Sequence, residues 1–187
     1  MRSLVPLFVF AIAAAAPVLA VEPVPVPTFR AIELHGGGMI TIVPAEVQRV
    51  TLLEGSTQFT RVRVDREGKL VIDACNEQCP RSYHLQIQIE SPHVLGVGVD
   101  GGGLINIGSG FAPQNELGVA VNGGGKIDAR SIDAAHVGAA VNGGGQILVR
   151  ARSALGATVN GGGEIRYWGN PVVASSIEGG GAVRKGG

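Results

Sequence analysis

Residues 121–127 read VNGGGKI, and five other stretches repeat this pattern of an apolar residue, a polar residue, three glycines, a variable residue and a second apolar residue. The other copies are LHGGGMI at 34–40, VDGGGLI at 99–105, VNGGGQI at 141–147, VNGGGEI at 159–165 and IEGGGAV at 177–183. From Asp100 onward, the polar positions of successive copies are separated by 22, 20, 18 and 18 residues. A repeat of this length indicates stacked structural units, so it predicts the architecture before any other feature does.

Each copy predicts a strand, a sharp corner and a second short strand. Val and Ile alternate with other residues on both sides of the glycines, as in Val119-Ala120-Val121 and Lys126-Ile127-Asp128, and a period of two is typical of strands. Three glycines in a row are poor strand formers, but they accept positive φ angles and allow backbones to approach closely. The sequence therefore predicts an all-β fold of stacked coils with glycine-rich corners.

Stacking in register would bring the polar corner residues into one row. This row would contain Asp100, Asn122, Asn142, Asn160 and Glu178. Because stacked Asn side chains hydrogen-bond along such a row, we interpret it as a structural ladder. Calcium binding by the same oxygens is the alternative, but the chain lacks the nine-residue repeat of calcium-binding β-rolls. The sequence predicts no metal and no cofactor.

The N-terminus has the composition of a secretory signal peptide. Residues 1–20 combine a positive start at Arg2, an apolar run over 4–16 and a small-residue cleavage motif ending at Ala20. An uncleaved membrane anchor is the alternative, although the run is short for one. We expect residues 21–28 to be a proline-rich spacer and residues 29–187 to be one domain without a membrane span. The expected location is the periplasm, the cell surface or the extracellular space.

The charge balance limits the classes of partner, and the cysteines indicate either a disulfide or a metal site. The chain has 15 basic and 15 acidic side chains and no basic run, so nucleic acid is not a predicted partner. Cys75 and Cys79 are the only cysteines, and an even count in an exported chain favours a disulfide. We expect this disulfide to close a hairpin loop. Metal binding with His84 or His93 is the alternative.

Residues 29–99 predict further paired strands that lead into the coils. Together with the corner repeat, five motifs are similar to a known family: FRAIEL at 29–34, MITI at 39–42, GKLVI at 68–72, IQIESP at 87–92 and IRYWGNP at 165–171. Over residues 29–183 the chain resembles the head GIN domain family, whose members are described as auto-transporter adhesins. The resemblance implies a right-handed parallel β-helix-like solenoid on an exported or cell-envelope protein, and it brings no catalytic residues.

No enzyme constellation is visible in the sequence. The acidic residues are scattered, whereas β-helix lyases and glycosidases need clustered carboxylates or bases. The Gly-x-Gly-x-x-Gly spacing at 96–101 is not followed by a helix, so it does not predict a nucleotide site. Tyr167 and Trp168 form the one aromatic pair, and it is either a binding surface or a cap over the last coil.

The predicted function is a non-enzymatic binding, adhesion or structural module of the bacterial cell envelope. Its partner would be an envelope or surface protein or glycan that the sequence does not identify. The alternative is a polysaccharide-acting lyase or glycosidase. The sequence predicts no particular oligomeric state.

Overall fold

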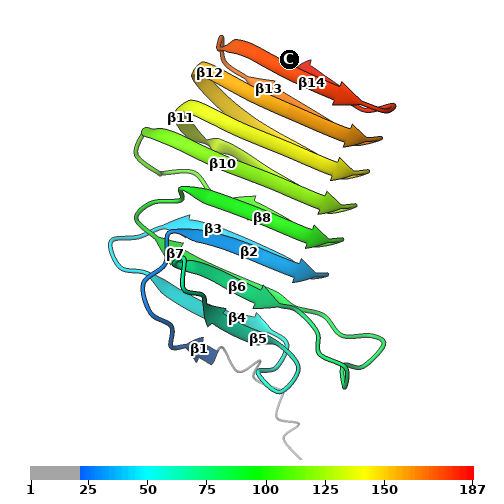
Figure 1. The fold of residues 1–187 in the computed structure, drawn as a ribbon. Helices are drawn as coiled ribbons and strands as arrows, with labels where there is room; N and C mark the ends of the chain where they lie inside the picture. The colour runs from blue at the N-terminus through cyan, green and yellow to red at the C-terminus, as the bar shows by residue number, and fades with distance from the viewer. Residues whose placement is uncertain (1–21) are drawn as a thin grey trace, which may run out of the picture.

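The computed structural model describes residues 22–187, which form strands and connections without any helix. All fifteen strands belong to one sheet (Figure 1). They are β1 (Glu22–Val24), β2 (Ala31–Gly36), β3 (Met39–Pro44), β4 (Arg49–Glu54), β5 (Arg61–Val64), β6 (Lys69–Asp73), β7 (Gln86–Ser91), β8 (Gly96–Gly101), β9 (Leu104–Ile107), β10 (Gln114–Gly123), β11 (Lys126–Gly143), β12 (Gln146–Gly161), β13 (Glu164–Trp168), β14 (Val172–Glu178) and β15 (Ala182–Lys185). The all-β class is thereby confirmed. The expected signal peptide lies outside the described residues.

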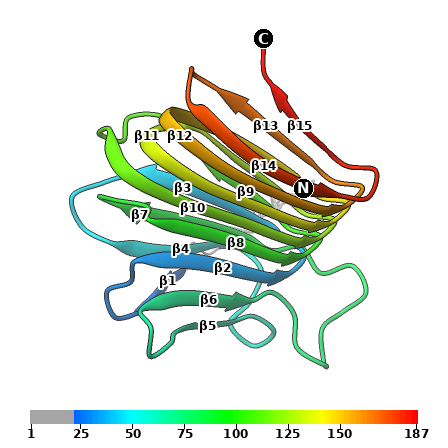
Figure 2. The same cartoon turned by 45° about the horizontal axis from the view of Figure 1, so that its top comes forward.

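The sheet folds back on itself into two parallel-stranded faces. The front face of Figure 1 stacks β6, β2, β8, β10, the second half of β11, the second half of β12 and β14. The back face stacks β7, β3, β9, the first halves of β11 and β12, then β13 and β15 (Figure 2). A glycine corner joins each front strand to the next back strand, except between β6 and β7. The long strands β11 and β12 bend to return to the front.

Two of the three glycines at each corner are required by the stacking. The first adopts positive φ, as at Gly123 (+106°) and Gly143 (+116°), a region that other residues rarely enter. A Cβ on Gly143 would lie 2.7 Å from the carbonyl oxygen of Gly123, so adjacent corners are in close backbone contact. A Cβ on Gly145 would lie 2.6 Å from the Gly125 oxygen, whereas one on Gly144 would meet nothing within 4 Å.

The inward side chains of both faces form a narrow aliphatic core. Ile40, Ile105, Ile127, Ile147 and Ile165 are fully buried in one column of the back face. Ala139 and Ala157 occupy buried inward positions of the front face. At the C-terminal end of the stack, the corresponding residues are open to solvent: Ile177 is 45% exposed and Val173 is 36% exposed. The core is therefore continuous along the stack and ends at β14 and β15.

The order of coils in space differs from their order in the chain. The first coil, β2 with β3, lies between the coil of β6 and β7 on one side and the coil of β8 and β9 on the other. The first glycine motif, which stands apart in the sequence, is therefore part of the stack. His35 is in register with Asp100 of β8 and with Asp73 of β6.

The sheet is mixed, so the expected parallel β-helix-like solenoid is not confirmed as such. Antiparallel pairs occur at the N-terminal end of the stack, between β1 and β4, between β4 and β7, and between β5 and β6. The N-terminal half thus contains the expected paired strands, but it also contributes β2 and β3 to the parallel stack. Three residues of the expected spacer form β1. The right-handed winding stays a prediction.

The predicted disulfide between Cys75 and Cys79 is present. Its loop, residues 74–85, projects from the body of the molecule (Figure 1). The expectation that it closes a hairpin is wrong, because β6 pairs with β2 and β5 whereas β7 pairs with β3 and β4. The loop instead crosses from one face to the other, in place of a glycine corner. Because the two sulfurs are joined, they offer no thiolate to a metal.

Removing this disulfide will lower the free energy of unfolding by about 2 kcal/mol, because the closed loop is short and restrains the unfolded chain only modestly. The comparison is between the wild-type chain and the Cys75→Ser/Cys79→Ser variant in urea. Wild-type protein treated with a reductant serves as the control and should match the variant. A difference below about 0.5 kcal/mol would show that the rest of the loop holds its own conformation.

Candidate functional site

The corner row is longer than the sequence predicted. It contains seven residues in register, in the order Asp73, His35, Asp100, Asn122, Asn142, Asn160 and Glu178. Asn142 Nδ2 donates to Asn122 Oδ1 over 2.9 Å, and Asn160 Nδ2 donates to Asn142 Oδ1 over 2.9 Å. Within residues 22–187, no group of three or more His, Cys, Asp and Glu side chains is arranged to hold a metal ion. The amides of the row thus bond to one another along the stack.

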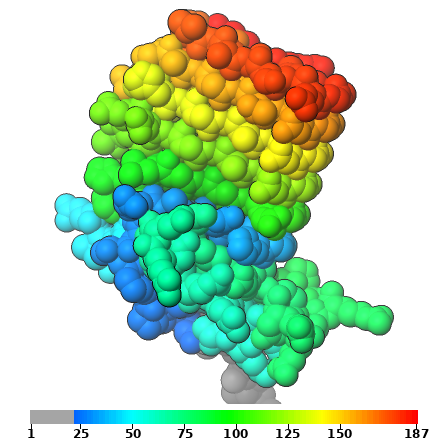
Figure 3. Space-filling view, viewed as in Figure 1, coloured from blue at the N-terminus to red at the C-terminus, as the bar shows by residue number. Residues whose placement is uncertain are grey.

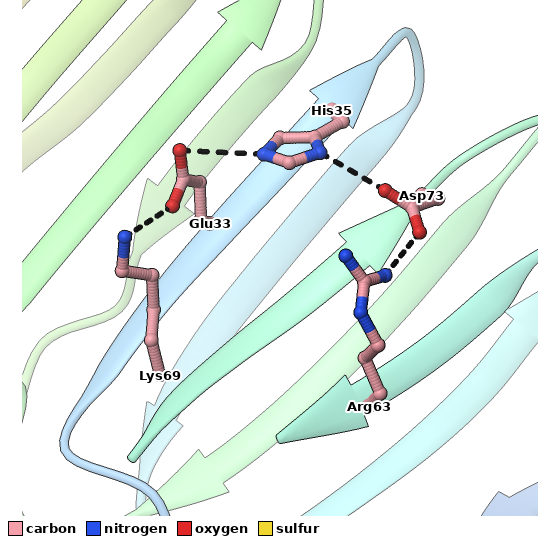
Figure 4. Close-up of polar contacts among 5 residues, drawn as sticks. All are labelled: Glu33, His35, Arg63, Lys69 and Asp73. Carbon is pink, nitrogen blue, oxygen red and sulfur yellow. Dashed lines mark hydrogen bonds and ion pairs between the residues drawn. The ribbon is translucent and has the colours of Figure 1, made fainter. Parts of the chain in front are cut away.

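A chain of five charged or ionisable side chains includes His35 and Asp73, the first two residues of this row (Figure 4). Lys69 Nζ lies 2.6 Å from Glu33 Oε2, and Glu33 Oε1 lies 3.3 Å from His35 Nε2. His35 Nδ1 lies 2.9 Å from Asp73 Oδ1, and the other Asp73 oxygen pairs with Arg63. These residues come from β2, β5 and β6, so the chain links the three strands where the parallel stack meets the antiparallel pair. Both ring nitrogens of His35 face carboxylates and neither contacts a hydroxyl or thiol, which argues for a structural role.

The ion pairs within this chain shift two pKa values. Partial burial raises the pKa of Glu33, but the hydrogen bonds from Lys69 and His35 outweigh it, so the pKa lies below its ordinary value of 4.5. The hydrogen bond to Glu33 raises the pKa of Lys69 above 10.5, with partial burial opposing it. Glu33 therefore contributes stability above pH 4.5 that is lost as the pH falls through its lower folded value. The contribution of Lys69 is present below pH 10.5 and is lost above it.

Replacing Glu33 by Gln will lower stability at pH 7 by about 0.5–1 kcal/mol, as expected for a half-exposed ion pair. The difference from wild type will shrink as the pH falls below 4.5, because the Glu33 carboxylate is protonated first in the unfolded state, and it will be lost as the pH falls through the lower pKa of the folded state. Urea unfolding of both proteins at a series of pH values measures this. A difference that stays constant down to pH 3 would contradict the assignment of the effect to this carboxylate.

The aromatic pair is divided between the two sides of the back face, because neighbouring residues of a strand point in opposite directions. Tyr167 packs against the core, whereas Trp168 lies outside. The Arg130 guanidinium carbon lies 5.0 Å from the Trp168 ring centroid, and Trp168 Nε1 donates to the Gly187 carbonyl over 3.0 Å. A hollow of about 350 Å³ beside them is lined by Asn106, Ile107, Asp128, Arg130, Ser131, Arg150 and Trp168. Trp168 thus already stacks with Arg130, which leaves one ring face less open to a ligand.

Our sequence reasoning missed a surface on β8, β10, β11, β12 and β14 of the front face, which is the face turned to the viewer in Figure 3. Two adjacent outward columns consist of small residues: Gly96, Gly118, Gly138, Gly156 and Ala174 in one, and Gly98, Ala120, Ala140, Thr158 and Ser176 in the other. We call these ten positions the small-residue face. Two hollows of about 310 and 550 Å³ meet on it at Gly118, and the corner row borders it. The available signal was the small residue immediately before each of the last two inward Val or Ala residues of β8, β10, β11 and β12.

Two glycines of this face, Gly138 and Gly156, are not required by the packing of the chain itself, whereas a Cβ at Gly96 would lie 3.3 Å from the Ala31 Cβ. A Cβ at Gly138 or Gly156 would meet nothing within 4 Å, and neither residue has positive φ. Glycine inside a strand costs about 0.5–1 kcal/mol relative to alanine, so a bare backbone here is unfavourable for folding alone. The Gly-x-Gly-x-x-Gly spacing at 96–101 belongs to β8 of this face and is followed by β9, not by the helix of a nucleotide site.

Comparison with known proteins agrees with the predicted family. The model of the family described as "Putative auto-transporter adhesin, head GIN domain" matches residues 95–171. No curated protein matches the chain in sequence. The crystal structure of a protein described as a "putative adhesin" from Bacteroides fragilis is similar in fold, with a TM-score of 0.58, 19% identity, and 91% of this chain and 98% of that chain covered.

Two structures from Parabacteroides distasonis match with a TM-score of 0.44 each. One is described as a "putative lipid binding protein", with 16% identity and coverage of 90% of this chain and 96% of that chain. The other is described as a "putative adhesin", with 17% identity and coverage of 89% and 96%. At such identities the B. fragilis structure supports the fold, and the family match supports the motif assignment. The resemblance to the head GIN domain family is thus confirmed by the family model, which matches residues 95–171 of this chain.

Proposed function

We propose that this chain is an exported, non-enzymatic binding or adhesion module of the bacterial cell envelope, with the small-residue face as its contact surface. The observation that carries the proposal is the unoccupied space above Gly138 and Gly156. Backbone left bare at a cost to stability favours a flat surface that another surface approaches closely. The amides of Asn122, Asn142 and Asn160 would supply hydrogen bonds along its border.

The family description and the disulfide support this proposal. The family is named for auto-transporter adhesins, and a disulfide is typical of oxidising compartments outside the cytoplasm. Residues 22–187 include no helix with the length and apolar character to cross a membrane. The proposal includes cleavage after Ala20, a domain over residues 29–187 and right-handed winding of the parallel coils.

Protease treatment of intact and lysed cells tests the location. Cleavage on intact cells would place the protein on the surface and support adhesion. Protection until the outer membrane is opened would contradict adhesion to other cells and would limit the partners to the periplasm.

A matched pair of variants tests the contact surface. Gly138→Trp adds a large side chain to the small-residue face where the structure has room, while Lys126→Trp makes a similar change on the exposed back face. Beads coated with each protein are applied to arrays of glycans and envelope proteins. We expect Gly138→Trp to weaken the binding found for wild type at least 10-fold and Lys126→Trp to leave it unchanged. Equal effects, or no binding by wild type, would contradict the proposal.

A further inference from the structure

A separate hollow lies at the N-terminal end of the stack, where the sheet stops short of closing. β1 and β5 are the two ends of the path of paired strands, and each has one neighbour: β4 for β1, and β6 for β5. A hollow of about 320 Å³ is lined by residues from the end of β1, the start of β5 and the loops beside them. These residues are Val24, Thr57, Gln58, Phe59, Thr60, Arg61, Val62 and Asn76.

The backbone beside this hollow has free hydrogen-bonding groups. In an antiparallel pair, alternate residues direct their N–H and C=O groups toward the partner, and the others direct theirs away from it. β5 pairs with β6 along one edge only, so its other edge keeps unpaired groups within the described part of the chain. Such an edge accepts an additional strand from another polypeptide.

Several residues that line the hollow are apolar or already hydrogen-bonded. Val24 and Val62 are partly buried against the core, and the Phe59 ring packs edge-on to Tyr83 at 5.6 Å between centroids. The buried Thr60 hydroxyl donates to the Ala74 carbonyl over 2.9 Å, so it needs no ligand. The hollow therefore accommodates an apolar side chain, while the strand edge accommodates a backbone.

One cation stands at the mouth of the hollow without an acidic partner. Arg61 is opposite Asp73 in the strand register, but the Asp73 carboxylate is bonded to Arg63 and His35. Among residues 22–187, no carboxylate pairs with the exposed Arg61 guanidinium. An Arg free of local partners is suited to a carboxylate from a ligand, which it binds with two parallel hydrogen bonds.

From these three features we infer that this hollow binds an extended segment of a partner polypeptide. The segment adds as a strand to the free edge of β5, places an apolar side chain over Val24 and Val62, and pairs a carboxylate with Arg61. This site is distinct from the small-residue face and does not depend on the function proposed for that face.

Three capped six-residue peptides, labelled with a fluorophore, test the inference by anisotropy. The first alternates Val and Glu, the second alternates Val and Lys, and the third repeats the first with N-methyl groups on alternate amides. We expect the Val/Glu peptide to bind, the Val/Lys peptide to bind at least 10-fold more weakly, and N-methylation to abolish binding because it removes the donors of strand pairing. No binding by the Val/Glu peptide, or equal binding after methylation, would overturn the inference.

Variants of exposed residues locate the site without disturbing the core. Arg61→Glu should weaken binding of the Val/Glu peptide at least 10-fold and strengthen binding of the Val/Lys peptide. Thr57→Trp should fill the hollow and prevent both peptides from binding. Arg66→Glu, in the turn between β5 and β6, makes the same charge change outside the hollow and should have little effect. If Arg66→Glu lost as much peptide binding as Arg61→Glu, the effect would come from the overall charge of this region, and the proposed site would be overturned. Gly138→Trp should leave peptide binding unchanged, which separates this test from that of the small-residue face.

Discussion

Alanine at Gly143 will destabilise the protein by about 2–4 kcal/mol, while alanine at the adjacent Gly144 will change stability by less than about 0.5 kcal/mol. Gly143 has φ of +116°, and its added Cβ would lie 2.7 Å from the Gly123 carbonyl oxygen. That oxygen accepts a hydrogen bond from Gly144 N over 3.0 Å, so it cannot withdraw without breaking a contact between corners. Gly144 has ordinary φ and open space around it.

Urea unfolding of the two single variants and the wild type measures this difference. A third variant, Gly145→Ala, separates sterics from backbone conformation, because Gly145 has no positive φ but its Cβ would lie 2.6 Å from the Gly125 oxygen. We expect it to lose about 1–3 kcal/mol through overpacking alone. Equal stability of the Gly143 and Gly144 variants would show that the corners relax independently of one another.

Ile127→Ala will cost about 2–5 kcal/mol, because Ile127 is fully buried and both neighbouring coils restrict collapse around the cavity. Val183 occupies the same inward column on β15, at the end of the stack, where it is only partly buried. Val183→Ala should cost less than about 1.5 kcal/mol, since fewer atoms surround the deleted methyl groups.

The measurement is the midpoint of thermal or urea unfolding for both variants, with circular dichroism confirming that the strands persist. Gly156→Ala on the small-residue face is a suitable control, because its Cβ meets nothing within 4 Å. It should be neutral or slightly stabilising. Similar losses for Ile127→Ala and Val183→Ala would mean that the end of the stack is as tightly packed as its middle.

The features that follow from local sequence were predictable. The strands around each glycine triplet, the all-β class and the bonded Cys75–Cys79 pair all depend on residues close together in the chain. The hydrogen bonds between Asn122, Asn142 and Asn160 are likewise as the repeat suggests, because equal spacing places equal residues side by side.

The features that depend on pairing between distant residues were not predictable. No local pattern indicates that β6 pairs with one edge of β2 while β8 pairs with the other. The ion-pair chain from Lys69 to Arg63 depends on that pairing, so the sequence does not predict it. The cysteine spacing predicts a stapled hairpin, yet the strands that flank the Cys75 loop belong to different faces. The Tyr167–Trp168 pair was treated as one unit, although the alternation of a strand separates its members.

Because β2 and β3 lie inside the stack, coils cannot be lost from the two ends of the chain with the same consequence during evolution. In a repeat protein with consecutive coils, loss of a terminal repeat removes an outer layer and leaves the others in contact. Here, deletion of β14 and β15 removes such a layer, but deletion of β2 and β3 would remove an inner one and separate β6 from β8. Relatives of this fold should therefore gain or lose coils on the C-terminal side, while the first two coils are kept or lost together.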